Sequence, residues 1–572
     1  MSKRRINNNC QSPLNSEKLF MAKKSVRQYY NVNSKSYLQL CIICREKCEL
    51  YNNRRNIQTR TQSINRPHFE LKNLTENEKS IAVVNSDITR EDGIIKIIEL
   101  PANCPKPISY IDHQCSRSCV SRITFKYTKT KHMNALSIPL LYGFTRYVTS
   151  DENLELKKVT YTAPCGLKIN DEHAMFKYLK VTGYGERKIT IDLFSFDCVM
   201  EPMYMLDVQK KFIRLNDISY GTELKPITVV NCFDAVLPKQ FKYITECETI
   251  NINNCYIKHN FSYGCNCNDN CEDKTKCSCW QLTYEGPKNY PKMFKDPNVG
   301  YSYKRLHEPV FTGIFECNTH CKCSKTCLNR VAQEPIKTSL QLFFSKKKGW
   351  GVRTLGDIPK GSFICTLIGV VRTDKDIDNN CETNKYLANL DFIRASEEIK
   401  DGYESSEYQS EEIKNSSESS DGEEYNPGSA VKSKNNMITT IMSLSKRARY
   451  TNTKIDVKHK LSKLNTRRKV ESNRYSLLKQ VNKDDGLYTL DAEFRGNIGR
   501  FFNHSCDPNI FIQNVFIDTH DLRFPTVAHF ALTNIPAGAE LAWNYNYIIE
   551  NVKNKKKIKC YCGSKNCKGR LL

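Results

Sequence analysis

The chain has 572 residues, of which 39% are hydrophobic and 10% aromatic, which is enough apolar material for two to four folded domains. Its 87 Lys and Arg residues outnumber its 62 Asp and Glu residues, and the formal charge of +25 favours polyanionic partners such as nucleic acid or nucleosomes. No apolar run is long enough to span a membrane and the N-terminus lacks a signal-peptide core, so we expect an intracellular protein without a membrane segment.

The 27 cysteines indicate metal binding rather than disulfide bonds. A reducing compartment disfavours disulfides, and neighbours at Cys-x-Cys spacing do not easily bridge each other. Zinc is held by thiolate and imidazole ligands, usually four at a time. Basic tracts such as Lys3-Arg4-Arg5 and Arg467-Arg468-Lys469 fit nuclear import, although each alone is explained as well by solvated loop charge.

Residues 1–133 are polar and are predicted to be largely irregular. Two groups of possible zinc ligands interrupt this region, namely Cys41, Cys44 and Cys48, and then Cys104, His113, Cys115 and Cys119. The first group needs a fourth donor from elsewhere, whereas the second has four residues of suitable type. Zinc binding and free thiols in a loosely ordered segment are both open for each group.

Residues 134–205 are predicted to form a small α+β domain. A strand is expected at 159–163, a turn at Pro164-Cys165-Gly166, and a helix from Asp171 that ends at Gly183. The unit resembles a methyl-CpG-binding domain, and the resemblance is carried by Tyr-Thr-Ala-Pro-Cys-Gly-Leu-Lys at 161–168 together with the helix.

In that family a loop between two strands enters the DNA major groove, and the matching basic residues here are Arg146, Lys157 and Lys158. Arg pairs with guanine through two hydrogen bonds, and Lys neutralises phosphate. The loop also carries Asp151, Glu152 and other acidic residues that oppose phosphate, so a module used for protein contact is an alternative. The resemblance implies DNA contact and leaves methyl-CpG selectivity open.

The strongest metal signal is a run of nine cysteines within residues 206–330. The ligand candidates are Cys265, Cys267, Cys271, Cys277, Cys279, Cys317, Cys321, Cys323 and Cys327. Nine thiolates satisfy three tetrahedral zinc ions if three sulfurs each bridge two metals. The net charge of such a cluster is −3, which suits the nearby Lys274, Lys276, Lys322 and Lys325. The pattern resembles the pre-SET domain of histone-lysine methyltransferases.

Three motifs further along resemble a SET domain at 331–548 when they are taken in this order. They are a strand at 340–344 with a Lys-Gly-Trp-Gly turn at 348–351, then Gly-Asn-Ile-Gly-Arg-Phe-Phe-Asn-His-Ser-Cys-Asp-Pro-Asn at 496–509, and then Glu-Leu-Ala-Trp-Asn-Tyr-Asn-Tyr at 540–547. Short strands and glycine turns predict a compact β-rich fold.

The SET resemblance implies methyl transfer from S-adenosylmethionine to a lysine side chain. By motif position it implies Tyr545 as the catalytic residue. It implies cofactor contacts for Lys348, Gly349, Trp350, Asn384, Tyr386, Arg500, Asn503 and His504. A packed β-core role is the alternative for each of them.

Several positions depart from the SET pattern. Asn544 stands where Asp is usual and Asn384 replaces a frequent acidic residue, so two charges are lost, and Ala542 replaces a Thr; the expected reactive groups remain. Trp543 has no hydroxyl to hold the water that limits methylation, which favours higher methylation, but it is also bulkier than the usual Phe or Tyr. The degree of methylation is therefore open.

The SET sequence is interrupted at about 393–485. Residues 397–424 hold eleven acidic residues and two lysines, and a Lys/Arg-rich stretch follows at 432–469. Low apolar content and segregated charge predict disorder, with solvated linker as the preferred interpretation over nucleosome contact or phosphorylation.

At 556–572 a post-SET module is expected, in which Cys560, Cys562 and Cys567 lack a fourth ligand that Cys506 can supply. The fold class is therefore multidomain and mainly β, with four zinc ions expected, three in pre-SET and one in post-SET. The combination resembles the bifurcated SET family of histone H3 lysine-9 methyltransferases, in its shorter branch without Tudor domains.

That resemblance implies a nuclear, heterochromatin-forming enzyme with histone H3 tails, nucleosomes, DNA and chromatin repressor proteins as partners. The alternative is a catalytically weak chromatin-binding scaffold, which the departures at Asn384 and Asn544 favour.

Overall fold

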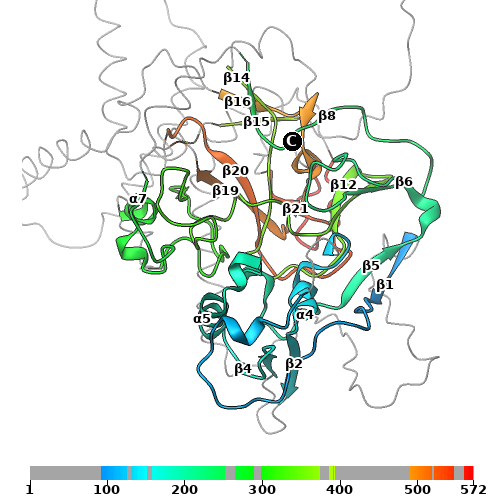
Figure 1. The fold of residues 1–572 in the computed structure, drawn as a ribbon. Helices are drawn as coiled ribbons and strands as arrows, with labels where there is room; N and C mark the ends of the chain where they lie inside the picture. Colours follow the sequence, from blue (N-terminus) through cyan, green and yellow to red (C-terminus); the bar gives the residue numbers. More distant parts are fainter. Residues whose placement is uncertain are drawn as a thin grey trace, which may run out of the picture. The chain divides into compact units, whose positions relative to one another are not determined.

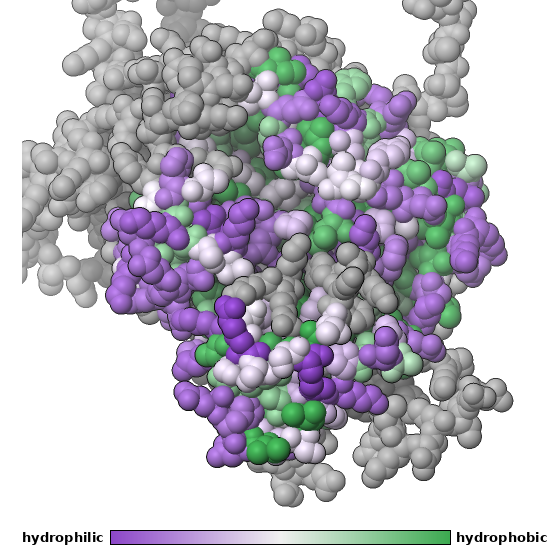
Figure 2. Space-filling view, viewed as in Figure 1, coloured by the Kyte–Doolittle hydropathy of each residue, from purple (hydrophilic) through white to green (hydrophobic). Residues whose placement is uncertain are grey.

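The computed structural model describes residues 92–124, 130–150, 157–187, 189–250, 264–288, 298–373, 386–390, 392, 488–517, 519, 521–545 and 559–570. The charged insertion, Asn384 and the group around Cys41 lie outside these ranges. Within them the chain is mainly β, as predicted (Figure 1). No helix in the described part is long and apolar enough to cross a membrane, and hydrophilic residues predominate on the described face in Figure 2.

The predicted α+β unit has the expected elements. Strands β2 (Thr145–Ser150), β3 (Lys157–Thr162) and β4 (Lys168–Ile169) form an antiparallel sheet, and helix α5 (Glu172–Thr182) follows it. Asp171 caps the helix by accepting from the N–H of Ala174 at 2.8 Å, and Gly183 ends it with φ of 72°. Asp171 and Gly183 therefore predict the two ends of the helix correctly.

Strands outside this unit extend the architecture toward both termini. Strand β1 (Gly93–Ile97), in the region predicted to be irregular, pairs antiparallel with β5 (Tyr204–Val208). In the nine-cysteine segment, helix α7 (Ser278–Lys288) begins directly after Cys277 and contacts β10 (Ile314–Phe315). The region before residue 134 and the nine-cysteine segment therefore both contain regular secondary structure.

Three four-stranded sheets build the C-terminal part. The first has the order β12-β11-β7-β6, with β6 (Ile213–Leu215), β7 (Thr228–Val230), β11 (Leu340–Ser345) and β12 (Gly349–Thr354). The second has the order β10-β19-β20-β13, with β13 (Phe363–Thr366), β19 (Ile510–Phe516) and β20 (Thr526–Ala531). The third has the order β15-β16-β14-β9, with β9 (Glu248–Thr249), β14 (Val370–Thr373), β15 (Leu387–Asn389) and β16 (Tyr488–Asp491).

Two short parallel pairs complete the sheets. They are β8 (Lys242–Tyr243) with β17 (Arg495–Gly496), and β18 (Asn503–His504) with β21 (Ala542–Trp543). The turn expected at 348–351 lies earlier than predicted, since β12 already begins at Gly349 and pairs there with Ser345. Gly349 has φ of +73°, which is the left-handed region that favours glycine.

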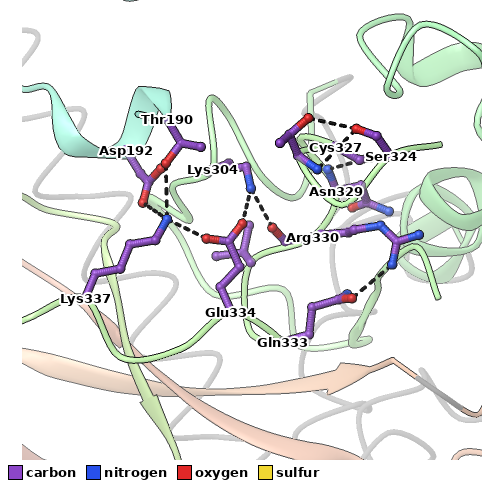
Figure 3. A network of polar contacts seen from close by, with 12 residues as sticks. Thr190, Asp192, Lys304, Ser324, Cys327, Asn329, Arg330, Gln333, Glu334 and Lys337 are labelled. Atoms are coloured by element: carbon purple, nitrogen blue, oxygen red, sulfur yellow. Dashed lines mark hydrogen bonds and ion pairs between the residues drawn. The ribbon is translucent and has the colours of Figure 1, made fainter. Parts of the chain in front are cut away.

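A network of charged side chains ties the α+β unit to the segment after the nine cysteines (Figure 3). The ammonium of Lys337 lies 2.8 Å from Asp192, 2.5 Å from Glu334 and 3.2 Å from the hydroxyl of Thr190. Lys304 also pairs with Glu334. Burial alone raises the pKa of Asp192, but Lys337 and Lys304 outweigh burial and hold this pKa well below its ordinary value.

We predict that Asp192→Asn lowers the free energy of unfolding by about 1–3 kcal/mol near neutral pH, because Lys337 loses a carboxylate partner. A depressed folded-state pKa stabilises the protein above the unfolded-state pKa of about 3.9, and this contribution is lost as the pH falls through the folded-state value. The difference between the unfolding temperatures of the variant and the wild type should therefore become smaller in acid.

The matched control is Asp207→Asn, which removes the partner of Lys96 from an ion pair whose side chains are 51% and 53% exposed. Exposed pairs contribute at most about 1 kcal/mol, so this variant should unfold almost like the wild type. Equal effects of the two substitutions would contradict a special role for Asp192.

Candidate active site and metal centres

The pairing of β18 with β21 brings Asn503 and His504 beside the motif at 540–547. His504 lies opposite Trp543 in this ladder, and Tyr545 follows two residues later. The ring of Tyr545 is 5.4 Å from the His504 ring and 4.7 Å from the Trp543 ring, measured between centroids. Two motifs that are distant in the sequence therefore form one aromatic and polar group.

Hydrogen bonds to the backbone of Phe502 and to the ring of His504 help to position Tyr545. Its hydroxyl donates to the carbonyl oxygen of Phe502 at 2.6 Å, and its backbone N–H donates to Nδ1 of His504 at 3.1 Å. Burial raises the pKa of Tyr545 well above its ordinary value, and Tyr386 and Glu540 add to the shift. The phenol is therefore protonated at neutral pH, with oxygen lone pairs left to accept a further hydrogen bond.

His504 is neutral and connects Tyr545 to a cysteine. Burial lowers the pKa of His504 to about 4, and the charge of Lys568 acts in the same direction. Because Nδ1 accepts from Tyr545, the neutral ring carries its hydrogen on Nε2, which lies 3.3 Å from Sγ of Cys506. The imidazole thus bridges the active-site backbone and a candidate metal ligand.

A second polar group lies beside the first. The amide of Asn503 donates to the carbonyl oxygen of Trp350 at 3.2 Å and to the carboxylate of Glu540 at 2.9 Å, and Lys348 forms an ion pair with the same carboxylate. A Cβ atom at Gly351 would lie 2.7 Å from the Asn503 amide nitrogen and 2.9 Å from Glu540. Only glycine therefore fits at this position without displacing the group.

Glu540 was not identified from the sequence as a site residue. It opens the quoted motif at 540–547, but nothing in its spacing indicates that it lies between Lys348 and Asn503. Its partners come from distant parts of the chain, so only the tertiary fold reveals them.

The structure brings together Arg500 and Tyr386, two of the residues expected to contact the cofactor. The Arg500 guanidinium is 3.8 Å from the centroid of Tyr386 and 4.3 Å from that of Phe241, and it donates to the carbonyl oxygen of Glu493 at 2.9 Å. Nε of Arg500 is buried without a hydrogen-bond partner among the described residues. Phe241 is a further residue that sequence reasoning missed.

The predicted post-SET ligands come together. The sulfurs of Cys506, Cys560, Cys562 and Cys567 all lie within 4.8 Å of one another. The backbone N–H of Lys568 donates to Sγ of Cys506 at 3.4 Å, a contact that favours a thiolate. Four such sulfurs fit one tetrahedral zinc ion.

The nine predicted pre-SET cysteines are all buried in one cluster. Eight of them form three overlapping groups of four, namely Cys265/Cys271/Cys277/Cys317, Cys265/Cys279/Cys317/Cys321 and Cys271/Cys317/Cys323/Cys327. Sulfurs shared between groups are what bridging thiolates require. Among the described residues Cys267 belongs to none of these groups, so its predicted role as a ligand remains a prediction.

Backbone and side-chain donors surround this cluster of thiols. The N–H groups of Asn318 and Asn329 donate to Sγ of Cys321 and of Cys327 at 3.2 and 3.3 Å. The guanidinium of Arg330, which is 7% exposed, lies 3.6 Å from Sγ of Cys323. Donors of this kind stabilise the thiolate form that zinc needs, so the environment fits the metal.

The three residues predicted to contact DNA differ in their exposure and in their hydrogen bonds within the chain. Lys157 and Lys158 are exposed at the start of β3. Arg146 instead donates to the carbonyl oxygens of Asp197 at 2.7 Å and Ser195 at 3.4 Å. The loop residues 151–156 lie outside the described ranges.

Family models match two segments of the chain: the SET domain over residues 349–546 and the Pre-SET motif over residues 219–330. The chain is 35% identical over 499 residues to the histone-lysine N-methyltransferase eggless of Drosophila melanogaster, covering 85% of this chain and 38% of the relative. It is 32% identical over 509 residues to the histone-lysine N-methyltransferase met-2 of Caenorhabditis elegans, covering 83% and 39%.

A relative of more similar length is the histone-lysine N-methyltransferase SETDB2 of Danio rerio, with 30% identity over 451 residues, 77% of this chain and 75% of the relative. Among solved structures, KRYPTONITE in complex with mCHG DNA and SAH is 27% identical, with a TM-score of 0.40 over 64% of this chain and 55% of that chain. The chain thus spans 38% of the length of eggless and 75% of that of Danio rerio SETDB2.

We predict that Cys506→Ser lowers the zinc content of the purified chain by one ion, because one of four thiolates is lost from a tetrahedral site. Elemental analysis after dialysis against a weak chelator measures the loss. Cys198→Ser is the matched control, since Cys198 is partly exposed and belongs to none of the ligand groups found among the described residues. An unchanged zinc content in Cys506→Ser would exclude the site.

Proposed function

Because this chain belongs to the family of SET-domain histone-lysine N-methyltransferases with a pre-SET module, we propose that it methylates lysine 9 of histone H3. The methyl donor in this proposal is S-adenosylmethionine, and the product mark promotes heterochromatin formation and silencing. The enzyme acts in the nucleus on nucleosomes. Its charge of +25 suits that polyanionic substrate.

The observation that carries the proposal is the position of Tyr545. Its protonated hydroxyl donates a hydrogen bond to the carbonyl oxygen of Phe502, and its ring lies beside the rings of Trp543 and His504. A lysine ammonium has a pKa of about 10.4, so its neutral form costs roughly 4 kcal/mol near neutral pH. An aromatic surround lowers this cost by disfavouring the charged form, and the Tyr545 oxygen can accept a hydrogen bond that orients the amine.

The residues around Asn503 fit the cofactor. Lys348 and Glu540 offer opposite charges, Gly351 lets Asn503 and Glu540 approach the backbone, and Nε of Arg500 is an unsatisfied buried donor among the described residues. When bound, S-adenosylmethionine supplies a methyl group on a positively charged sulfur. The chain's part is to align amine and methyl, an effect of roughly 7–11 kcal/mol, without an acid–base triad.

Zinc and DNA complete the proposal. Three zinc ions in the nine-cysteine cluster and one at Cys506 hold the modules on either side of the catalytic domain. The unit at 134–205 contacts DNA through Lys157 and Lys158, with Arg146 in a supporting position, and chromatin repressor proteins are further partners. The domain limits at 134–205, 206–330, 331–548 and 556–572 are part of the proposal.

The second candidate is a chromatin-binding scaffold with little catalysis. It is favoured by Asn544, which stands one residue before Tyr545 where an acidic residue is usual. Incubating the full chain with histone H3 and labelled S-adenosylmethionine separates the two. Absence of both methyl transfer and cofactor binding supports the scaffold, whereas label on lysine 9 of H3 supports the enzyme.

We predict that Tyr545→Phe slows methyl transfer by about 100-fold or more, because it removes the hydroxyl while keeping the ring. Asn503→Ala should weaken cofactor binding in equilibrium titrations, since it breaks the contacts to Trp350 and Glu540. Tyr147→Phe is the control, because Tyr147 is 54% exposed on β2 and far from both motifs in sequence. A wild-type rate of methyl transfer in Tyr545→Phe and wild-type cofactor affinity in Asn503→Ala would refute the roles assigned to these two residues.

We also predict an order of events on chelation. Stripping zinc from Cys506 should abolish methyl transfer before the β-sheets unfold, because Cys506 holds His504 and His504 accepts from Tyr545. Chelator titration followed in parallel by activity and by circular dichroism measures this. Loss of activity only when the sheet signal collapses would contradict the coupling.

A further inference from the structure

Among the described residues, one more set of metal-ligating side chains converges outside the sites described above. Nε2 of His113 and the sulfurs of Cys115, Cys119 and Cys165 all lie within 4.8 Å of one another. Nε2 of His113 is 3.2 Å from Sγ of Cys119 and 3.5 Å from Sγ of Cys115. In a tetrahedral site with Zn–N of about 2.0 Å and Zn–S of about 2.3 Å, nitrogen and sulfur ligands are about 3.5 Å apart.

The tautomer of His113 suits metal binding. Its Nδ1 lies 2.7 Å from the carbonyl oxygen of Ile111, and a carbonyl can only accept, so Nδ1 carries the hydrogen of the neutral ring. The lone pair is therefore on Nε2, which faces the sulfurs. A backbone carbonyl on the other ring nitrogen is the usual outer-shell partner of a zinc-bound histidine.

The sulfurs have donors of their own. The backbone N–H of Ser116 donates to Sγ of Cys119 at 3.4 Å, at the start of the short helix η2 (Arg117–Val120). Sγ of Cys165 lies 3.5 Å from the hydroxyl of Tyr178 on α5. Such contacts favour thiolates over thiols.

The fourth ligand comes from a different part of the chain than the sequence suggests. Cys165 sits in the turn between β3 and β4, and the stretch from Ile108 to Tyr110 runs directly against this turn. The N–H of Ile108 donates to the carbonyl oxygen of Pro164 at 3.1 Å, and a Cβ atom at Gly166 would lie 2.6 Å from that stretch. Cys104, which lies nearer in sequence, is not part of the group.

Apolar burial alone does not explain why this stretch lies where it does. Ile108, Tyr110 and Ile111 are 52%, 48% and 74% exposed. The stretch therefore gains little from the hydrophobic effect and needs another attachment. A metal held by four side chains can provide it, because structural zinc contributes folding free energy directly.

We propose that His113, Cys115, Cys119 and Cys165 form a structural zinc site that fastens residues 104–124 to the unit at 134–205. The ligand set of three thiolates and one imidazole is one that structural zinc uses. This ion is additional to those in the nine-cysteine cluster and at Cys506. It makes the segment before Asn134 an integral part of that unit.

The first test is zinc content in matched variants of the full chain. Cys165→Ser should lose one zinc ion per chain by elemental analysis after dialysis against a weak chelator, and Cys104→Ser should lose none. The same zinc content in Cys165→Ser and wild type overturns the proposal. Loss of zinc from Cys104→Ser but not from Cys165→Ser also overturns it.

The second test uses the wild-type chain, so it does not depend on a variant that folds. Alkylation with iodoacetamide, read by peptide mass spectrometry, should leave Cys115, Cys119 and Cys165 protected in the zinc-loaded chain and modify all three after chelation. Cys104 should be modified in both states. Modification of the three cysteines at the rate of Cys104 before chelation overturns the proposal.

Discussion

The pairing of β18 with β21 is the contact on which the candidate active site depends. It consists of two residue pairs, and a ladder this short is not stable alone. The side chain of Asn509 reinforces it by donating to the carbonyl oxygen of Glu540 at 2.8 Å and accepting from the N–H of Ala542 at 2.9 Å. Because Glu540 also holds Lys348 and Asn503, one amide side chain positions both the aromatic and the polar group. The asparagine at the end of the 496–509 motif therefore has a structural reason to be there.

The nine-cysteine module depends on a different kind of core. Its buried cluster consists of the nine cysteines and Trp280, so sulfur takes the place of aliphatic side chains. Structural zinc contributes about 10–16 kcal/mol of apparent binding free energy, which a core this small cannot obtain from apolar burial. The surplus negative charge of such a cluster was expected to be met by surface lysines. The buried Arg330 is a further cation at the sulfurs, and it also donates to the carbonyl oxygen of Asn318 at 2.7 Å.

Local features were predictable from the sequence, and long-range partners were not. Asp171 and Gly183 delimit α5 because capping is decided by single residues and the backbone next to them. The spacing of the cysteines predicted both the nine-cysteine cluster and the group at Cys506, because cysteines close together in the sequence can direct their sulfurs at the same metal. Glu540 and Phe241 were missed because their partners are brought to them by sheets that form between remote strands. Arg146 shows the same limit, since its bonds to Ser195 and Asp197 depend on how the chain returns after α5.

His504 shows why distance along the chain is a poor guide to coupling. Its ring has one acceptor nitrogen, used by the N–H of Tyr545, and one donor nitrogen, directed at Sγ of Cys506. Protonation would remove the acceptor, but burial keeps the pKa of His504 near 4, so the two contacts persist together at neutral pH. A thiolate held by metal is a fixed and strong acceptor, whereas a free thiol is neither. We therefore propose that the metal state of the Cys506 site affects Tyr545 through the His504 imidazole alone, without movement of a domain.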